Sequence, residues 1–130
     1  RFTEVHDVGV ELNPALVNGQ VTGGIAQAVG QALMEKMTYD PDSGQVLTGS
    51  FMDYCMPRAS DLSFFDIGSH PVPTATNPLG VKGAGEGGTV GALASVMNAV
   101  NDALAPLGVK NLGMPATPER VWAAIQSAQA

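Results

Sequence analysis

The pattern of apolar and polar positions divides the chain into short strands and longer helices. Residues 2 to 10 alternate loosely between apolar and polar side chains, which predicts a strand that runs into a turn at Asn13-Pro14. From Val21 to Met37 the apolar side chains Ile25, Val29, Leu33 and Met37 recur every four residues. This repeat is typical of an amphipathic helix.

The middle of the chain has the pattern of strands and turns. The cluster Asp40-Pro41-Asp42-Ser43-Gly44 is a turn signal, and residues 45 to 48 after it are expected to form a short strand. A second strand is expected from Asp61 to Ile67. These elements indicate a hairpin or another strand connection in this region.

Two further helices are predicted in the second half. The glycine-rich stretch 77 to 88 is followed by apolar residues at alternating spacings of three and four, namely Val90, Leu93, Met97, Val100 and Leu104. The last helix should begin at Thr117-Pro118-Glu119, with threonine as N-cap, and should turn Val121 and Ile125 inward. Short strands mixed with helices predict an α+β fold, with residues 1 to 130 forming one segment of a larger domain.

Composition excludes several classes of protein. Twelve acidic residues outnumber six scattered basic ones, so the clustered positive charge of a nucleic-acid surface is absent. No run approaches the roughly 18 to 20 apolar residues of a spanning helix, so membrane insertion is not expected. The single cysteine, Cys55, permits no internal disulfide and favours a reducing, cytoplasmic location. We expect its side chain to be buried.

Other features of the composition point to a larger assembly. Charged residues make up 14% of the chain, below the roughly one quarter of an ordinary globular protein. Sixteen glycines and nine prolines suit close backbone approaches and rigid turns. The chain also begins at Arg1 inside a strand-like segment. We therefore expect it to be cut from something longer and to be embedded among other chains or domains.

The most distinctive stretch is Lys82-Gly83-Ala84-Gly85-Glu86-Gly87-Gly88. Glycines let a ligand approach the backbone, and a helix that begins near Gly88 presents free N–H groups and the positive end of its dipole. The helix end favours an ionised Glu86, whereas burial would raise its pKa towards the range of a useful base. The residues alone leave a second interpretation open, in which Glu86 only complements the helix dipole. The stretch lacks the spacing of the common nucleotide-binding loops.

Three ordered motifs together resemble the molybdenum hydroxylases, the family of xanthine dehydrogenase, aldehyde oxidoreductase and carbon monoxide dehydrogenase. They are Val5-His6-Asp7-Val8-Gly9 through Asn13-Pro14, the stretch Gly19 to Gln27, and the stretch Gly80 to Gly88. The resemblance covers nearly the whole chain and corresponds to the end of the molybdopterin-binding large subunit. Gly87-Gly88 resembles the bacterial aldehyde and carbon monoxide dehydrogenase-like members.

The resemblance implies a role for each motif. The glutamate that matches Glu86 is the base that takes a proton from a molybdenum-bound hydroxyl. The glutamine that matches Gln20 contacts the cofactor, and Gly23 and Gly24 beside it allow the same close approach. The backbone of Lys82, Gly83, Ala84 and Gly85 lines the metal site. No protein atom of this chain is expected to bind the metal.

The resemblance also implies cofactors and partners. The cofactor would be molybdenum on a molybdopterin, with the cytosine dinucleotide form included, and FAD and [2Fe-2S] clusters would sit on partner domains or subunits. Partners would be the remainder of the large subunit, iron-sulfur and flavin subunits, and a small-molecule substrate such as an aldehyde or N-heterocycle, oxidised with water as the oxygen source. Two other hypotheses stay open: a non-catalytic scaffold or assembly module of the same fold, and a small anion- or nucleotide-binding domain.

Overall fold

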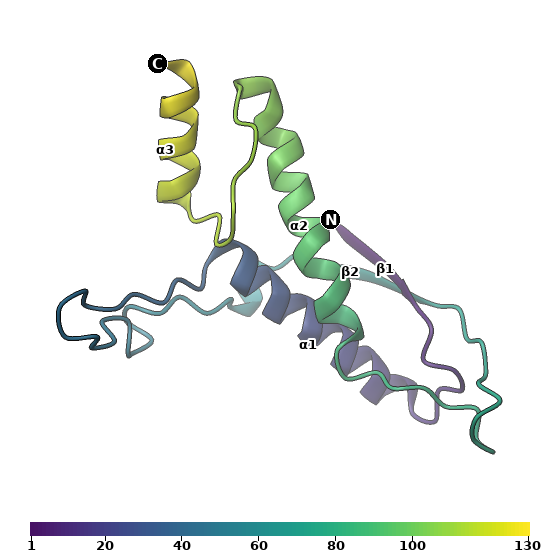
Figure 1. The fold of residues 1–130 in the computed structure, drawn as a ribbon. Helices are drawn as coiled ribbons and strands as arrows, with labels where there is room; N and C mark the ends of the chain where they lie inside the picture. Colours follow the sequence, from purple (N-terminus) through teal and green to yellow (C-terminus); the bar gives the residue numbers. More distant parts are fainter. The chain divides into compact units, whose positions relative to one another are not determined.

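The structure is a computed structural model that describes residues 1–130. The chain separates into two compact units, residues 1–28 with 58–92 and residues 29–57 with 93–130. Along the chain lie β1, α1, β2, α2 and α3, together with two short 3-10 helices (Figure 1). The predicted α+β class is confirmed.

The first unit holds the two strands. β1, Phe2–His6, pairs in parallel with β2, Phe65–Ser69, in a continuous register (Figure 1). The rings of Phe2 and Phe65 meet edge to face with centroids 6.1 Å apart. The second strand was predicted to start at Asp61, which is too early, because residues 59–61 form a 3-10 helix. The Asp61 carboxylate accepts a hydrogen bond from the N–H of Arg58 at the start of this helix.

Helix α1, Pro14–Leu33, is displaced from its predicted bounds. It begins at Pro14 because the Asn13 side-chain oxygen accepts a hydrogen bond from the N–H of Leu16 at 3.2 Å, and proline fits the first helical position. It ends at Leu33, so the prediction that Met37 lies on this helix was wrong. The turn expected at Asn13-Pro14 is therefore the start of a helix. Its buried side chains Val21, Ile25 and Ala28 belong to the first unit.

Helix α2, Gly87–Leu104, confirms the helix predicted after the glycines. With the turn that follows it, Gly87–Leu107 is apolar and long enough to cross a membrane by length and composition, with a mean hydropathy of 1.2. One such helix is weak evidence, because core helices of soluble proteins pass the same test.

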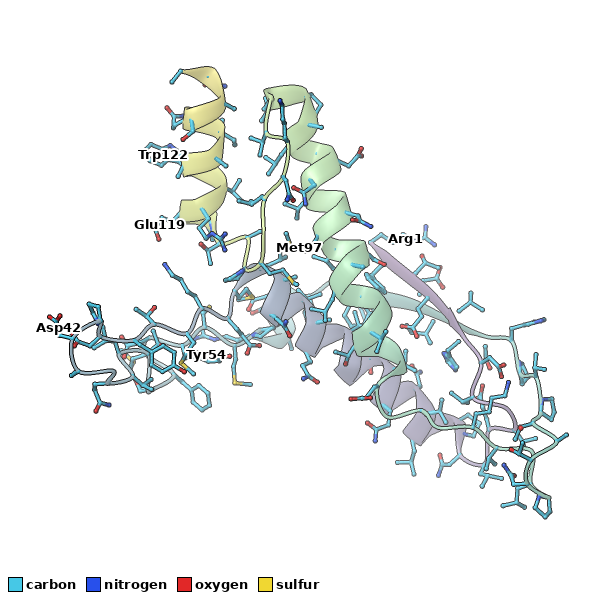
Figure 2. All side chains as sticks on the ribbon, viewed as in Figure 1. Arg1, Asp42, Tyr54, Met97, Glu119 and Trp122 are labelled. Atoms are coloured by element: carbon cyan, nitrogen blue, oxygen red, sulfur yellow. The ribbon has the colours of Figure 1, made fainter.

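The core of the second unit lies between its helices and the 108–117 segment. Its buried members are Ala32, Met97, Leu104, Val109, Leu112 and Ala116. Helix α3, Pro118–Gln129, adds Val121 and Ile125 to this cluster, as predicted. Thr117 is at the N-cap position, but its hydroxyl makes no capping hydrogen bond. Trp122 is 65% exposed and projects from α3 away from the 108–117 segment (Figure 2).

Residues 34–57 of the second unit contain no helix and no strand. The predicted turn at Asp40 is present, with the Asp40 carboxylate accepting hydrogen bonds from the N–H and hydroxyl of Ser43. The strand expected at residues 45–48 is reduced to one isolated bridge between Tyr39 and Val46. Cys55 is exposed, so the prediction that it is buried was wrong.

Candidate active site

The first and third sequence motifs meet in the first unit. Gly9 and Val81 form an antiparallel bridge. On either side of it, the N–H of Lys82 donates to the carbonyl of Val8 at 2.9 Å, and the N–H of Val10 donates to the carbonyl of Gly80 at 3.1 Å. We call residues 80–88 the glycine loop. Its start is thus paired with residues 8–10.

The positive φ angles of Gly9 and Gly80 explain two of these glycines. Gly9 has φ +65° and Gly80 has φ +67°, a backbone conformation that other residues rarely adopt. A Cβ on Gly9 would also overlap the carbonyl oxygen of Gly80. Both residues are therefore required by the contact between the two segments.

The side chain of Lys82 is held by Asp7. Its ammonium lies 2.5 Å from one carboxylate oxygen of Asp7, while the other oxygen accepts the N–H groups of Gly9 at 2.9 Å and Val72 at 3.0 Å. The hydrogen bond from Lys82, followed by those from Val72 and Gly9, holds the pKa of Asp7 well below its usual range. The Lys82 ammonium is thus neutralised within the chain. A cofactor contact by Lys82 remains a prediction and would use its backbone carbonyl, because its N–H is already bonded to Val8.

The middle of the glycine loop makes no backbone hydrogen bond within the chain. The backbone of Gly83, Ala84 and Gly85 makes no hydrogen bond. A Cβ built on Gly83 or Gly85 would meet no atom within 4 Å. These N–H and carbonyl groups are available to a ligand, as the predicted cofactor contact requires.

Glu86 immediately precedes α2. Its carbonyl accepts the N–H groups of Thr89 at 3.0 Å and Val90 at 3.1 Å, which closes the first turn of the helix. Its side chain is exposed and makes no hydrogen bond or ion pair. The carboxylate is therefore free to meet a reacting group, and this chain alone does not bury it. The helix N-terminus next to it carries partial positive charge.

The second motif meets the third where α1 crosses the start of α2. A Cβ on Gly88 would overlap the carbonyl of Val21, and a Cβ on Gly24 would lie 2.9 Å from the N–H nitrogen of Thr89. The hydroxyl of Thr89 donates to the carbonyl of Gly24 at 3.2 Å. Gly24 and Gly88 are thus needed for the contact between the helices, which is a reason that the sequence did not reveal.

Gln20 and Gly23 lie on the exposed side of the same stretch of α1. Gln20 directly precedes Val21, which touches Gly88, so the structure brings the Gln20 turn and the glycine loop into one region. Both Gln20 and Gly23 are exposed, and a Cβ on Gly23 would meet nothing within 4 Å. No contact within the chain explains either residue. Their cofactor contacts remain predictions.

Two residues that position the loop were not singled out by sequence reasoning. Asp7 is one of them, and Asn77 is the other. The Asn77 side chain donates to the carbonyl of Val81 at 2.9 Å and accepts the N–H of Leu79 at 3.1 Å. The signal available in the sequence was the Asn-Pro pair at 77 and 78, because asparagine before a turn often bonds to nearby backbone.

The chain offers no protein ligand set for a metal ion. The structure holds no group of three or more His, Cys, Asp or Glu side chains that could bind one. His6 is half-buried beside Glu11, with Nε2 3.6 Å from Oε1, and Glu11 also accepts the hydroxyl of Ser69. A metal at the glycine loop would therefore need ligands that a cofactor brings.

Comparison with known proteins gives related sequences along most of the chain. Residues 1–63 match the model of the molybdopterin cofactor-binding domain. The chain is 44% identical over 117 residues to the nicotine 6-hydroxylase large subunit of Paenarthrobacter nicotinovorans, covering 90% of this chain and 14% of that protein. It is 37% identical over 122 residues to the carbon monoxide dehydrogenase large chain of Afipia carboxidovorans, covering 94% and 15%.

The chain also matches solved structures along most of its length. The Cu,Mo-CO dehydrogenase superposes with a TM-score of 0.92 at 35% identity, covering 99% of this chain and 16% of that chain. Quinoline 2-oxidoreductase from Pseudomonas putida 86 superposes with a TM-score of 0.89 at 44% identity, covering 97% and 16%. The chain therefore spans about one sixth of the length of the proteins that it matches.

Proposed function

Because this chain belongs to the large-subunit family of the molybdenum hydroxylases, we propose that it is the C-terminal part of a molybdopterin-binding subunit in which Glu86 acts as the catalytic base. The observation that carries this proposal is the free Glu86 carboxylate at the end of an unpaired backbone stretch. Helix α2 begins directly after it. The residues of the chain fit a large anionic cofactor at this place.

The fit rests on groups that the chain leaves unsatisfied. The backbone of residues 83–85 has no partner, and the glycines leave room for an approach to it. The first N–H groups of α2 favour negative charge in front of them. Gln20 adds an exposed amide that can donate and accept hydrogen bonds. These groups would hold a molybdopterin, whether as the plain pterin or as the cytosine dinucleotide form.

The role of this chain in the reaction is proton transfer. When bound, the molybdenum cofactor supplies the redox centre that takes two electrons from the substrate carbon, and water supplies the oxygen. Glu86 accepts a proton at its carboxylate, which makes the incoming oxygen a better nucleophile. A positioned general base contributes roughly a hundredfold to ten-thousandfold in rate. The residues around Glu86 keep the approach open because they are glycines.

We propose a nitrogen heterocycle as the substrate class. The two matches at 44% identity carry the names of enzymes for nicotine and quinoline, whereas the carbon monoxide dehydrogenases match at 37% and 35%. Both nicotine and quinoline contain an aromatic ring with nitrogen. The partners would be the rest of the large subunit and iron-sulfur and flavin subunits that carry the electrons away, in the cytoplasm.

The test is the metal content and turnover of the complete complex. We expect the purified complex to contain about one molybdenum per large subunit and to reduce an artificial electron acceptor when quinoline or nicotine is added. A correctly assembled complex without molybdenum would contradict the proposal and favour a non-catalytic scaffold. Molybdenum with oxidation of carbon monoxide or aldehydes alone would contradict only the substrate class.

A further inference from the structure

Residues 83–85 of the glycine loop lie between two hydrogen-bonded residues, Lys82 and Glu86, which we call its upstream and downstream anchors. On one side, the N–H of Lys82 is bonded to Val8, and its ammonium is bonded to Asp7. On the other side, the carbonyl of Glu86 is bonded within the first turn of α2. Residues 83–85 between these points make no hydrogen bond of their own. The position of Glu86 therefore depends on both anchors.

We propose that Asp7 is a positioning residue that fixes the upstream anchor and so holds Glu86 where it can accept a proton. The proposal rests on the function proposed above for Glu86. Asp7 does not touch the reacting atoms in this account. It acts through Lys82 and the glycine loop.

The hydrogen bonds of Asp7 join three segments of the chain. One oxygen accepts the N–H of Gly9 in its own segment and the N–H of Val72 after β2, and the other accepts the ammonium of Lys82 in the glycine loop. Val72 and Lys82 lie 65 and 75 positions from Asp7 in the sequence, so this carboxylate is a junction between distant segments. Hydrogen bonds with a charged partner are about twice as strong as neutral ones.

No other acid replaces Asp7 at this junction. Lys82 forms an ion pair with Asp7 and with no other residue. The acid next along the chain, Glu11, is engaged by Ser69 and lies beside His6. An asparagine at position 7 could still accept the two N–H groups, but it would lose the charge that holds the Lys82 ammonium. The Asp7→Asn substitution therefore weakens the contact with Lys82 and retains the hydrogen bonds from Gly9 and Val72.

The experiment uses the complete molybdenum-loaded complex with four variants: Asp7→Asn, Glu86→Gln, the double variant, and Asp66→Asn as the control. Asp66 is also an aspartate in an ion pair, with Arg1 at 2.8 Å, in the same unit and with no contact to the glycine loop (Figure 2 labels Arg1). Turnover is expressed per bound molybdenum. Hydrogen exchange of the peptide covering residues 80–86 is measured on the same samples.

We expect Asp7→Asn to lower kcat at least about fivefold with less than a twofold change in KM, since misplacement of a catalytic group lowers the rate of the chemical step. Exchange at residues 80–86 should become faster, whereas Asp66→Asn should change neither quantity. In the Glu86→Gln background, Asp7→Asn should cause no further loss, because the group that it positions is already absent.

The outcomes separate this inference from the base assignment. If Glu86→Gln keeps near wild-type turnover, the base assignment fails regardless of Asp7. If Glu86→Gln is inactive while Asp7→Asn behaves like the control, the base assignment stands and the positioning role is overturned. Loss of molybdenum in Asp7→Asn with unchanged turnover per molybdenum, or a full further loss in the double variant, also overturns the positioning role.

Discussion

The hydroxyl of Thr89 donates a hydrogen bond to the carbonyl oxygen of Gly24 at 3.2 Å, and this contact marks where the helix after the glycine loop crosses α1. The contact ties the second sequence motif to the third. It also fixes the start of α2, and with it the residue immediately before the helix, Glu86. Small residues on both helices make the approach possible.

Substitution of Gly88 by alanine should disturb this crossing. The new Cβ would overlap the carbonyl of Val21, so the helices must move apart at a cost of about 1 to 3 kcal/mol. Hydrogen exchange of the peptide covering the start of α2, measured in the intact large subunit, should become faster.

Gly91→Ala is the matched control for this change. Gly91 lies in the same helix, and a Cβ there meets nothing within 4 Å. Alanine in an open helical position stabilises by roughly 0.5 to 1 kcal/mol relative to glycine, so exchange should be unchanged or slower. Equal effects of the two substitutions would contradict the helix contact inferred from Gly88.

Asn101 should be important for the stability of the second unit. Its amide accepts the N–H of Leu112 at 2.7 Å and donates to the carbonyl of Leu112 at 3.3 Å, which fixes the 108–117 segment on α2. Asn101→Ala leaves both backbone groups without this partner and should cost about 1 to 3 kcal/mol.

The measurement for Asn101 is hydrogen exchange of the peptide covering residues 108–117. Asn98→Ala is the control, because Asn98 is exposed on the same helix and makes no side-chain hydrogen bond. We expect faster exchange in this peptide for Asn101→Ala than for Asn98→Ala. Equal exchange rates in the two variants would contradict the prediction.

Tyr54 should titrate at unusually high pH. Its hydroxyl donates a hydrogen bond to the Glu35 carboxylate, and this bond, together with burial and the charge of Glu35, raises the pKa of Tyr54 above the ordinary value of 10.0. Because the pKa is raised in the folded state, the stability that this bond contributes is complete below pH 10. It is lost as the pH rises through the raised value.

A difference titration tests this shift. The ultraviolet absorbance of phenolate is recorded against pH for the wild type and for Tyr54→Phe, and the difference reports Tyr54 alone. We expect its midpoint above pH 10. A midpoint at or below pH 10 would show that the bond to Glu35 does not form in solution.

Local patterns were sufficient to predict much of the fold. Helix α2 was predicted from the three-and-four spacing of apolar residues after Gly88, and α3 from the Thr117-Pro118 pair. Both signals are local, because side-chain periodicity and helix starts depend on neighbouring residues. The start of α1 was missed because Asn13-Pro14 suits both a turn and a helix N-terminus. The strand expected at residues 45–48 needs partners for pairing, and only one bridge forms.

Only part of the candidate site could be predicted, because only part of it is a local pattern in the sequence. Glu86 and the glycines around it are visible as a local pattern. The partners of Asp7, by contrast, are Val72 and Lys82, which lie 65 and 75 positions after it in the sequence. Likewise, Gly24 was attributed to a cofactor, but its contact with Thr89 depends on how two helices cross. Contacts between distant segments are set by packing, which a single sequence does not display.

The turnover of the complete complex carrying Glu86→Gln tests the central claim most directly. Glutamine keeps the size of the side chain and its position before α2 but does not accept a proton at neutral pH. We predict full molybdenum content with turnover lowered at least about a hundredfold. Full molybdenum content with turnover close to the wild type would contradict the assignment of Glu86 as the base.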